Sequence, residues 1–418
     1  MNKEPLTLSD LSKIDYSPFL LDNNPFPTVE IPGAVRMTTA DRVQVLEHFK
    51  RSLSTTVFEG LSSTTILVGE YGSGKSHLLK YFQSVVNTEL LHSKNKVLGI
   101  YVKSVGRNFR DLYLYFIDNI GMELLKDIAE KVLKDYFLSI GDEKLRKIVF
   151  DEKLKEGYED ITKAPVKNIL IGSQFYDIFR ETAKTVPKLK KFSTISAILH
   201  LCHPDYTSLA WRWLIGENLS NDERKVIRVE ENIDDYLTAE TVVNDMMTIF
   251  VNSGIKTIVL LVDEFENFTL MPRNLRDKFM DGLRHFIDDN PQGILLVFTT
   301  TPFAWTELSK VTSALIRRLV GNEYELKFFN RQETEELIIR YLDLFRIKDA
   351  SLPEIVKEFS TNKQIFPFTE QAIDKIQEKS DGLVSSIIKI SRKAIDSAID
   401  SKQKIIDEKI VDEAALNI

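Results

Sequence analysis

Eight consecutive residues, GEYGSGKS from Gly69 to Ser76, combine three glycines with a lysine and two serines. They match the pattern G-x-x-x-x-G-K-[ST] at every fixed position. Glycines allow the backbone to curl so that its N–H groups point inward and bind phosphate oxygens. Lys75 is then expected to neutralise the β- and γ-phosphates of ATP, and the Ser76 hydroxyl to bind Mg²⁺. The motif therefore predicts a site for ATP and magnesium.

The segments on either side of the motif are those that such a loop requires. Residues 64–68, TTILV, are β-branched and apolar, which is typical of a buried strand. Residues 77–86, HLLKYFQSVV, carry apolar side chains at helical spacing, and the positive end of a helix dipole favours phosphate binding. A glycine-rich turn that matches by chance is the alternative. The expected nucleotide-binding residues are Gly69, Glu70, Tyr71, Gly72, Ser73, Gly74, Lys75, Ser76 and His77.

Two carboxylates, Asp263 and Glu264, follow a second apolar run, TIVLLV at residues 257–262. An unbroken run of this kind indicates a central strand of a parallel sheet. An aspartate after such a strand completes the Mg²⁺ shell in phosphoryl-transfer enzymes, and a neighbouring carboxylate can deprotonate the attacking water. We expect Asp263 to bind the metal and Glu264 to be the general base, with Asp263 or Glu266 as the base if Glu264 is not. A solvated acidic strand end is the alternative.

Threonines follow a third predicted strand, GILLVFT at residues 293–299. A polar residue at the end of this strand could contact the γ-phosphate and respond to hydrolysis. Thr300 is the candidate for this sensor, and Thr299 or Thr301 could equally hold the position. A polar cap of the strand explains the same residues as well.

Two adjacent arginines, Arg317 and Arg318, stand just before a fourth predicted strand at residues 323–329. An arginine at a subunit edge can reach the γ-phosphate of a neighbouring subunit and stabilise the charge of the transition state. Both are therefore candidate catalytic residues. Ion pairing with carboxylates on the surface is the alternative role for adjacent arginines.

Taken in order, the segments GEYGSGKSH, VLLVDEFENF, LLVFTTTP and ALIRRLVGNEYEL resemble an AAA+ ATPase of the origin-recognition and helicase-loader type. Within that group the sequence is similar to the ATP-binding proteins of BREX phage-defence systems, through GEYGSGKSH, AWRWLIGE at residues 210–217, and DEFENF. The resemblance spans residues 25–400. It implies a homo-oligomeric ATPase that remodels or loads proteins on duplex or single-stranded DNA, with defence-system or helicase proteins as partners. A slow nucleotide-gated switch that recruits protein partners is the competing function.

Two features depart from the origin-recognition pattern. That family usually places an arginine three residues after the glycine of a lid-helix motif, whereas DGLVSS has Ser385 there. The sequence also ends at Ile418, so we expect no winged-helix DNA-binding domain after the lid. Both features weaken the expectation of origin binding.

The predicted fold class is α/β, with a parallel-sheet P-loop core of the AAA+ type, a helical insertion and a C-terminal helical lid. The insertion is expected because Lys75 and Asp263 are 263 − 75 = 188 residues apart, and one further strand at residues 96–103 uses little of that length. A helix over residues 40–53 is expected to turn Val43, Leu46 and Phe49 inward. The predicted parts are an extended arm (1–30), the core in two pieces (31–106 and 241–330), the insertion (107–240) and the lid (331–418).

Composition limits the partners and the compartment. The net charge is −7, so nucleic-acid binding would need a local basic patch. The best candidate is Lys188, Lys190 and Lys191 in VPKLKKF, although such short runs are usually solvated. A single cysteine, Cys202, and the lack of a secretory signal or of an apolar run of about 20 residues indicate a cytoplasmic protein without a membrane segment. HLCH, at residues 200–203, has no second ligand cluster, so a buried helix end is expected rather than zinc.

Overall fold

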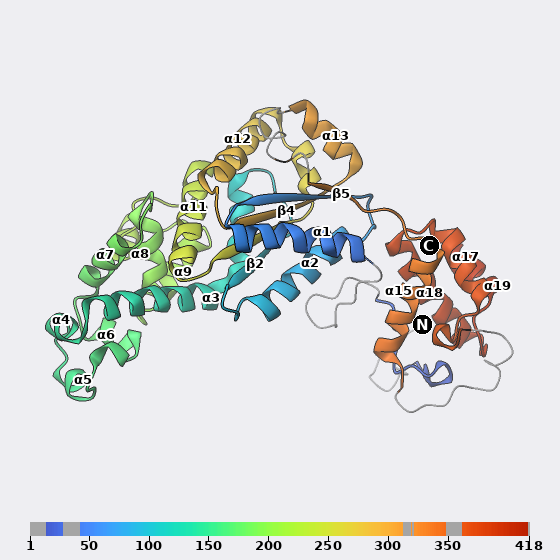
Figure 1. Ribbon diagram of the computed structural model, residues 1–418, viewed down its shortest axis with the longest axis horizontal. Coiled ribbons are helices and arrows are strands. Elements are labelled where there is room, and N and C mark those ends of the chain that lie inside the picture. The colour runs from blue at the N-terminus through green and yellow to red at the C-terminus, as the bar shows by residue number, and fades with distance from the viewer. Residues whose placement is uncertain (1–13, 28–41, 312–318, 320–321, 348–361, 417–418) are drawn as a thin grey trace, which may run out of the picture. The chain divides into compact units, whose positions relative to one another are not determined.

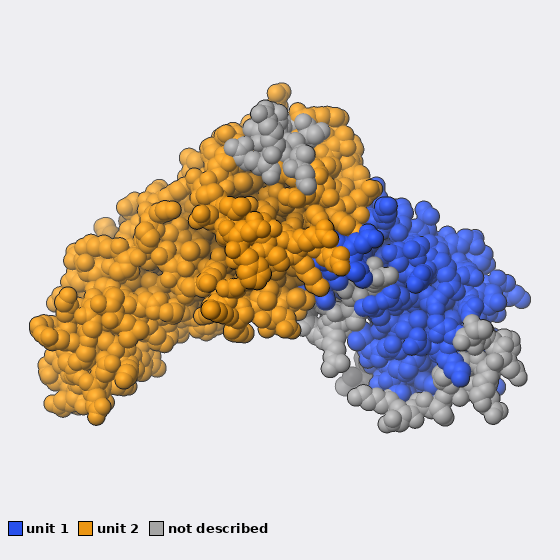
Figure 2. Space-filling model, viewed as in Figure 1, with its two compact units in different colours: residues 1–46, 69–81, 326–418 blue, residues 47–68, 82–325 orange. Residues whose placement is uncertain are grey.

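The computed structural model describes residues 14–27, 42–311, 319, 322–347 and 362–416. Its contacts divide the chain into two compact units (Figure 2). The first unit comprises residues 1–46, 69–81 and 326–418, and the second comprises residues 47–68 and 82–325. The glycine-rich loop therefore belongs to the first unit, and the strands belong to the second.

The second unit is built on a five-stranded sheet of order β2-β3-β4-β1-β5, in which all neighbouring strands are parallel. Every residue of β3 and β4 is buried, as expected where both faces of a parallel sheet are covered. The α/β fold with a parallel P-loop core is thus confirmed, and four strands lie within one residue of their predicted ranges. The strands are β1 (Ser63–Val68), β2 (Val97–Val102), β3 (Thr257–Val262), β4 (Ile294–Thr300) and β5 (Glu323–Glu325).

The strand predicted at residues 323–329 is shorter than expected. Only Glu323–Glu325 form β5 and pair with β1. The apolar residues that follow serve another purpose, because Phe329 lies in the hydrophobic core of the first unit. Its N–H donates to the carbonyl of Gly382 at 2.8 Å rather than to a strand.

Helices form the connection between β2 and β3, which confirms the predicted helical insertion. The long helix α3 (Phe109–Ile140) runs from the sheet to a cluster of shorter helices, and α11 (Tyr236–Asn252) packs along α3 and leads back to β3 (Figure 1). One hydrophobic core includes residues of both the sheet and this cluster. The shorter helices are α4 (Asp142–Ile148), α5 (Glu152–Glu156), η5 (Ile161–Lys163), α6 (Val166–Ile171), α7 (Phe175–Thr185), α8 (Phe192–His200), α9 (Thr207–Leu214) and α10 (Asn221–Val226).

Helix α1 (Val43–Ser54) buries a face that differs in part from the predicted one. Phe49 is buried as expected, and its ring stacks on that of Phe82 in α2 (Lys75–Val85), with the centroids 4.0 Å apart. Val43 is 53% exposed, however, and Val45 is buried in its place. Val45 and Phe49 are four residues apart and so share one face of the helix, which Val43 does not. The other elements of the second unit are η3 (Thr55–Glu59), η4 (Val86–Leu90), η6 (Phe265–Leu270), α12 (Arg273–Asp289) and α13 (Pro302–Val311).

The first unit is mainly helical and has its own hydrophobic core. Residues 14–27, within the predicted arm, contribute Phe19 and Phe26 to this core, and the Tyr16 hydroxyl donates to Asp396 at 2.8 Å. No helix in the described ranges of either unit is long and apolar enough to cross a membrane. The elements of the first unit include η2 (Ser17–Phe19), α15 (Arg331–Phe345), η7 (Lys363–Ile365), α17 (Glu370–Ser380), α18 (Val384–Asp400) and α19 (Glu408–Ala415).

Candidate nucleotide site

The loop predicted to bind phosphate follows β1 directly and leads into α2. Gly72 and Gly74 have φ angles of +79° and +93°, a region that strongly favours glycine. A Cβ atom on Gly69 would lie 2.7 Å from the Oγ of Ser73, so the loop also closes tightly on itself at its start. The backbone therefore requires glycine where the motif has it.

Several hydrogen-bond donors gather at this loop. Helix α2 begins at Lys75, and the first N–H groups of a helix have no partner within the helix. The Ser73 hydroxyl is buried and has no hydrogen-bond partner in the described part of the chain. The Nζ of Lys75 donates to the carbonyls of Gly69 and Glu70, at 2.8 and 3.1 Å. Backbone N–H groups, a buried hydroxyl and an ammonium at one helix start fit the phosphates of a nucleotide.

The remaining residues of the motif are more open to solvent. Glu70 and Tyr71 are exposed, and the Tyr71 ring centroid lies 5.5 Å from the Nζ of Lys75. Ser76 and His77, in the first turn of α2, are half-buried. Ser76 lies in the first turn of α2, which is the position that the motif assigns to a magnesium ligand.

Arg42 and Ser385, which lie outside the motif, form hydrogen bonds with the loop, and no sequence signal marked either as a partner of it. The Arg42 guanidinium donates to the carbonyl of Ser73 at 3.1 Å. The N–H of Ser385 donates to the carbonyl of Gly72 at 3.1 Å, and a Cβ on Gly72 would lie only 2.2 Å from the Ser385 Oγ. The serine that stands where an arginine was expected therefore packs on the loop, and α18 meets the loop through a short side chain.

In the second unit, Asp263 follows β3 and is held at both carboxylate oxygens. The Thr299 hydroxyl donates to Oδ1 at 2.5 Å, and the Tyr101 hydroxyl donates to Oδ2 at 2.8 Å. The side chain is almost fully buried, at 2% exposure, and the backbone N–H of Asp263 donates to Val102 at 2.8 Å. Hydroxyl donors of this kind orient a carboxylate ligand toward a metal ion. Tyr101 was not identified from the sequence, because it stands within a strand 162 residues away.

Glu264 has a different environment from its neighbour. It is exposed, and its backbone adopts a left-handed conformation with φ of 47° and ψ of 42°, which is uncommon for a residue with a side chain. Such conformations gather at functional sites. The amide of Asn267 donates to Oε2 of Glu264 at 3.1 Å and to the Ser104 hydroxyl at 2.8 Å. A buried aspartate is thus followed by an open, oriented carboxylate that can accept a proton.

The three candidate threonines at the end of β4 have different environments. Thr299 contacts Asp263, and its Oγ1 also accepts the N–H of Glu264 at 3.2 Å. The Thr300 hydroxyl is buried and without a partner among the described residues. Thr301 accepts the N–H of Ala304 at 3.3 Å, near the start of α13. The structure therefore connects Thr299, and not Thr300, with the acidic pair, while the sensor role stays a prediction for each.

The remaining sequence candidates are two adjacent arginines and a short basic run. Arg317 and Arg318 lie outside the described residues. The side chains of Lys190 and Lys191 form ion pairs with Asp289 and Glu231, so most of the positive charge expected of that patch is neutralised.

The HLCH segment forms part of a buried aromatic cluster. His200 Nδ1 lies 2.7 Å from the carbonyl of Ser196, and its ring meets the edges of Phe175 and Phe179. Cys202 is buried as a free thiol. No group of three potential metal ligands gathers anywhere in the described ranges.

Strand order brings the motif-bearing strands to one edge of the sheet. β1, β4 and β3 are adjacent and parallel, so Val68, Thr300 and Val262 end at the same edge. Neighbouring strands are about 4.8 Å apart, which puts the ends of β1 and β3 about 10 Å apart. A glycine-rich loop that opens a helix, with an acidic pair after another parallel strand, defines a P-loop protein of the AAA+ class.

A comparison with protein families identifies the family within this class. Residues 39–361 match the model of the BREX system ATP-binding protein BrxC/D. The match covers more than half of the chain, and the protein belongs to this family. The resemblance found in the sequence is thereby confirmed.

Individual relatives are more distant. An uncharacterised HTH-type transcriptional regulator of Methanocaldococcus jannaschii is 29% identical over 164 residues, which is 39% of this chain; the chain spans only 36% of that protein's length. The ORC2 protein of Aeropyrum pernix is similar with a TM-score of 0.47 and 13% identity, over 95% of this chain and 71% of that one. Cdc6p from Pyrobaculum aerophilum is similar with a TM-score of 0.47 and 11% identity, over 97% and 71%. Since these TM-scores are below 0.5, the assignment rests on the family match and the site.

Proposed function

We propose that the protein binds ATP with Mg²⁺ at the carboxyl edge of its sheet and hydrolyses it to ADP and phosphate. The observation that carries the proposal is the pair of Asp263 and Glu264, in which a buried carboxylate held by two hydroxyls is followed by an exposed one. Membership of a family of ATP-binding proteins supports the choice of nucleotide. The hydrogen-bond donors of the glycine-rich loop support the binding of a triphosphate.

Each residue has a role that follows from its chemistry. The loop N–H groups and Lys75 would hold the phosphates, and the Ser76 hydroxyl and the Asp263 carboxylate would be the magnesium ligands. Magnesium would supply positive charge that stabilises the charge developing on the phosphates. Glu264 would orient the attacking water and accept its proton, with Asn267 fixing the carboxylate. Thr299 or Thr300 would sense the γ-phosphate.

We further propose that the ATPase is oligomeric and couples turnover to remodelling or loading on DNA, in a complex with defence-system or helicase proteins. Arg317 or Arg318 would then contact the nucleotide of the neighbouring subunit, since both precede β5 at the end of the strand order. The competing function is a slow switch that binds ATP and recruits partners, and the short Ser385 side chain in place of a lid arginine favours slow turnover.

Phosphate release measured with and without single-stranded and duplex DNA, together with the oligomer mass in ATP, tests these proposals. Turnover that rises with DNA and with assembly supports the remodelling ATPase. Slow, monomeric turnover that DNA does not change would favour the switch. Absence of any phosphate release above that of a Glu264→Gln variant would refute hydrolysis itself.

A further inference from the structure

A cavity of about 490 Å³ opens among the helices between β2 and β3. Its apolar lining includes Val166, Leu201 and Cys202, which are all buried. Five charged residues also line it: Lys126, Glu130 and Lys134 of α3, and Lys163 and Lys167 across from them. The volume is within the range of ligand-binding pockets, which is roughly 300–1,000 Å³.

The charged lining is strongly positive in a chain that is acidic overall. Four lysines and one glutamate give it a formal charge of 4 − 1 = +3, against −7 for the chain. Lys134 pairs with Glu130 at 3.5 Å and Lys163 with Asp160 at 3.8 Å, both longer than a good hydrogen bond. Within the described part of the chain, Lys126 and Lys167 form no ion pair. The cavity therefore keeps two uncompensated ammonium groups.

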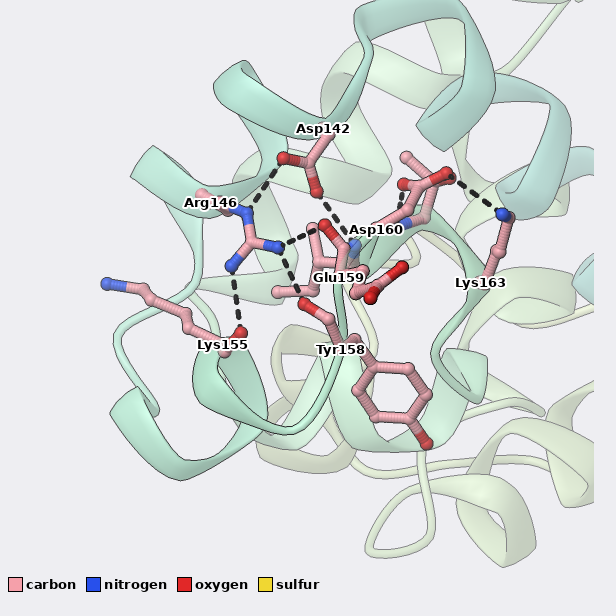
Figure 3. A network of polar contacts seen from close by, with 9 residues as sticks. Asp142, Arg146, Lys155, Tyr158, Glu159, Asp160 and Lys163 are labelled. Atoms are coloured by element: carbon pink, nitrogen blue, oxygen red, sulfur yellow. Dashed lines mark hydrogen bonds and ion pairs between the residues drawn. The ribbon is translucent and has the colours of Figure 1, made fainter.

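The wall that carries Lys163 is held in place by a network of polar contacts (Figure 3). The Asp142 carboxylate binds the Arg146 guanidinium at 2.7 Å and accepts the N–H of Ile161 at 2.7 Å. Asp160 accepts the N–H and the hydroxyl of Thr162, at 3.0 and 2.7 Å. Arg146 also donates at 2.7–2.9 Å to three carbonyls, those of Lys155, Tyr158 and Glu159. These contacts within the chain fix the backbone of the loop before Lys163, so this backbone needs little reordering when a ligand binds.

The pattern of the lining restricts the ligand. The cavity is lined by lysines and no arginine, so it offers point charges rather than the planar fork that suits single carboxylates. Lys126 and Lys134 are eight residues apart on α3, about 12 Å along the helix axis. One strand of a nucleic acid carries a phosphate about every 3.4 Å along the duplex axis, so this distance spans about three phosphates. No aromatic side chain lines the cavity for base stacking, which leaves the backbone as the part recognised.

We propose that this lysine-lined cavity binds the phosphate backbone of a nucleic acid strand without regard to sequence. The inference rests on the proposed action on DNA and assigns the DNA contact to α3 and residues 163–167. It replaces the patch at Lys188, Lys190 and Lys191, since two of those lysines already pair with Asp289 and Glu231.

Two double variants of the full chain test the assignment. Lys126→Ala/Lys167→Ala removes the uncompensated charges, and Lys190→Ala/Lys191→Ala removes the same charge from the ion-paired patch in the same insertion. The control keeps the two backbone N–H groups that donate to Asp245, so we expect it to fold like the wild type. Affinity for a fluorescently labelled single-stranded oligonucleotide is measured by anisotropy at several salt concentrations.

The cavity variant should bind on the order of tenfold more weakly at low salt, equally for different sequences. Its slope of log affinity against log salt should fall by about 1.4, because each lost phosphate contact on a single strand removes about 0.7. The control should bind like the wild type, and ATP turnover without DNA should be unchanged in both.

Wild-type binding and slope in the cavity variant would overturn the assignment, as would a loss confined to the control. If DNA still stimulated ATP turnover in that case, the proposed DNA-coupled ATPase would stand and only the cavity would be wrong. If the wild type bound polyglutamate in a way that depended on Lys126 and Lys167 and did not bind the oligonucleotide, the cavity would be a site for an acidic polypeptide. The nucleic-acid proposal would then be wrong.

Discussion

Thr299 donates its hydroxyl proton to Oδ1 of Asp263 at 2.5 Å. The other oxygen of the same carboxylate accepts from Tyr101, so the buried aspartate has little freedom to rotate. Metal ligands that are oriented in this way lose affinity or activity when the outer partner is removed, typically by 10–100-fold. The residue after Asp263 is the exposed Glu264, and in the function proposed above Asp263 would bind the metal while Glu264 would accept the proton.

Replacing Thr299 with valine should weaken magnesium-dependent turnover by about 10–100-fold, because Oδ1 of Asp263 loses its donor while the side-chain volume is kept. The loss should be partly restored by raising the Mg²⁺ concentration, and a titration of phosphate release against Mg²⁺ measures it. Thr300→Val is the matched control, since the Thr300 hydroxyl is buried without a partner among the described residues. Thr300→Val should leave the Mg²⁺ dependence unchanged and cost little stability. The reverse ranking of the two variants would make Thr300 the functional residue.

Glu264→Gln should retain ATP binding and reduce hydrolysis by about 10²–10⁴-fold, because an amide cannot accept the proton of water. The variant keeps an oxygen that can accept from Asn267, so the side chain should stay in position. Single-turnover hydrolysis and ATP affinity are measured on the same preparation. Hydrolysis within about a factor of two of the wild type would show that Glu264 is not the base. Asp263 and Glu266 would then be tested.

The helical insertion should lose stability in acid through His200. Burial lowers the pKa of His200 from 6.5 to about 4. A buried neutral histidine contributes its full stability above pH 6.5. As the pH falls from 6.5 toward 4, the unfolded state binds a proton that the folded state does not, and this contribution is lost. The full loss is about 3 kcal/mol from this shift. His200→Phe should therefore reduce the pH dependence of unfolding in that window.

Tryptophan fluorescence during urea unfolding measures this effect, since Trp211 and Trp213 lie on α9, which packs against the helix of His200. The wild-type midpoint should fall between pH 7 and pH 4.5 by more than that of the variant. His92→Phe, at an exposed position, is the control and should behave like the wild type. Equal pH dependence of His200→Phe and the wild type would rule out His200 as the cause.

The sequence was sufficient where local pattern determines structure. Unbroken apolar runs placed β1 to β4, and the spacing of glycines, Lys75 and Ser76 defined the loop, because these features depend on neighbouring residues. Prediction failed where the local structure depends on residues that are far away in the sequence. Phe329 leaves the predicted strand because its packing partners belong to the first unit. The prediction that Val43 of α1 faces inward was wrong, because its side chain is exposed to solvent and not packed in the core.

The same limit applies to side-chain partners. Lys190 pairs with Asp289, 99 residues away, so its charge could not be judged from the basic run alone. Tyr101 and Thr299 reach Asp263 from two other strands, and only the strand order brings them together. The position of an acidic pair can be read from a sequence, whereas the groups that orient it cannot.

ATP binding by the wild type and by Lys75→Ala, measured by isothermal titration with Mg²⁺ present, tests the central claim most directly. Lys75 is buried at the start of α2 and supplies the ammonium that lies at the loop carbonyls. The wild type should bind ATP, and the variant should show no tight binding, because mainly backbone N–H groups would remain to hold the phosphates. Lys50→Ala, on the exposed face of α1, should bind like the wild type. Unchanged ATP affinity in a folded Lys75→Ala protein would contradict the assignment of this loop as the phosphate site.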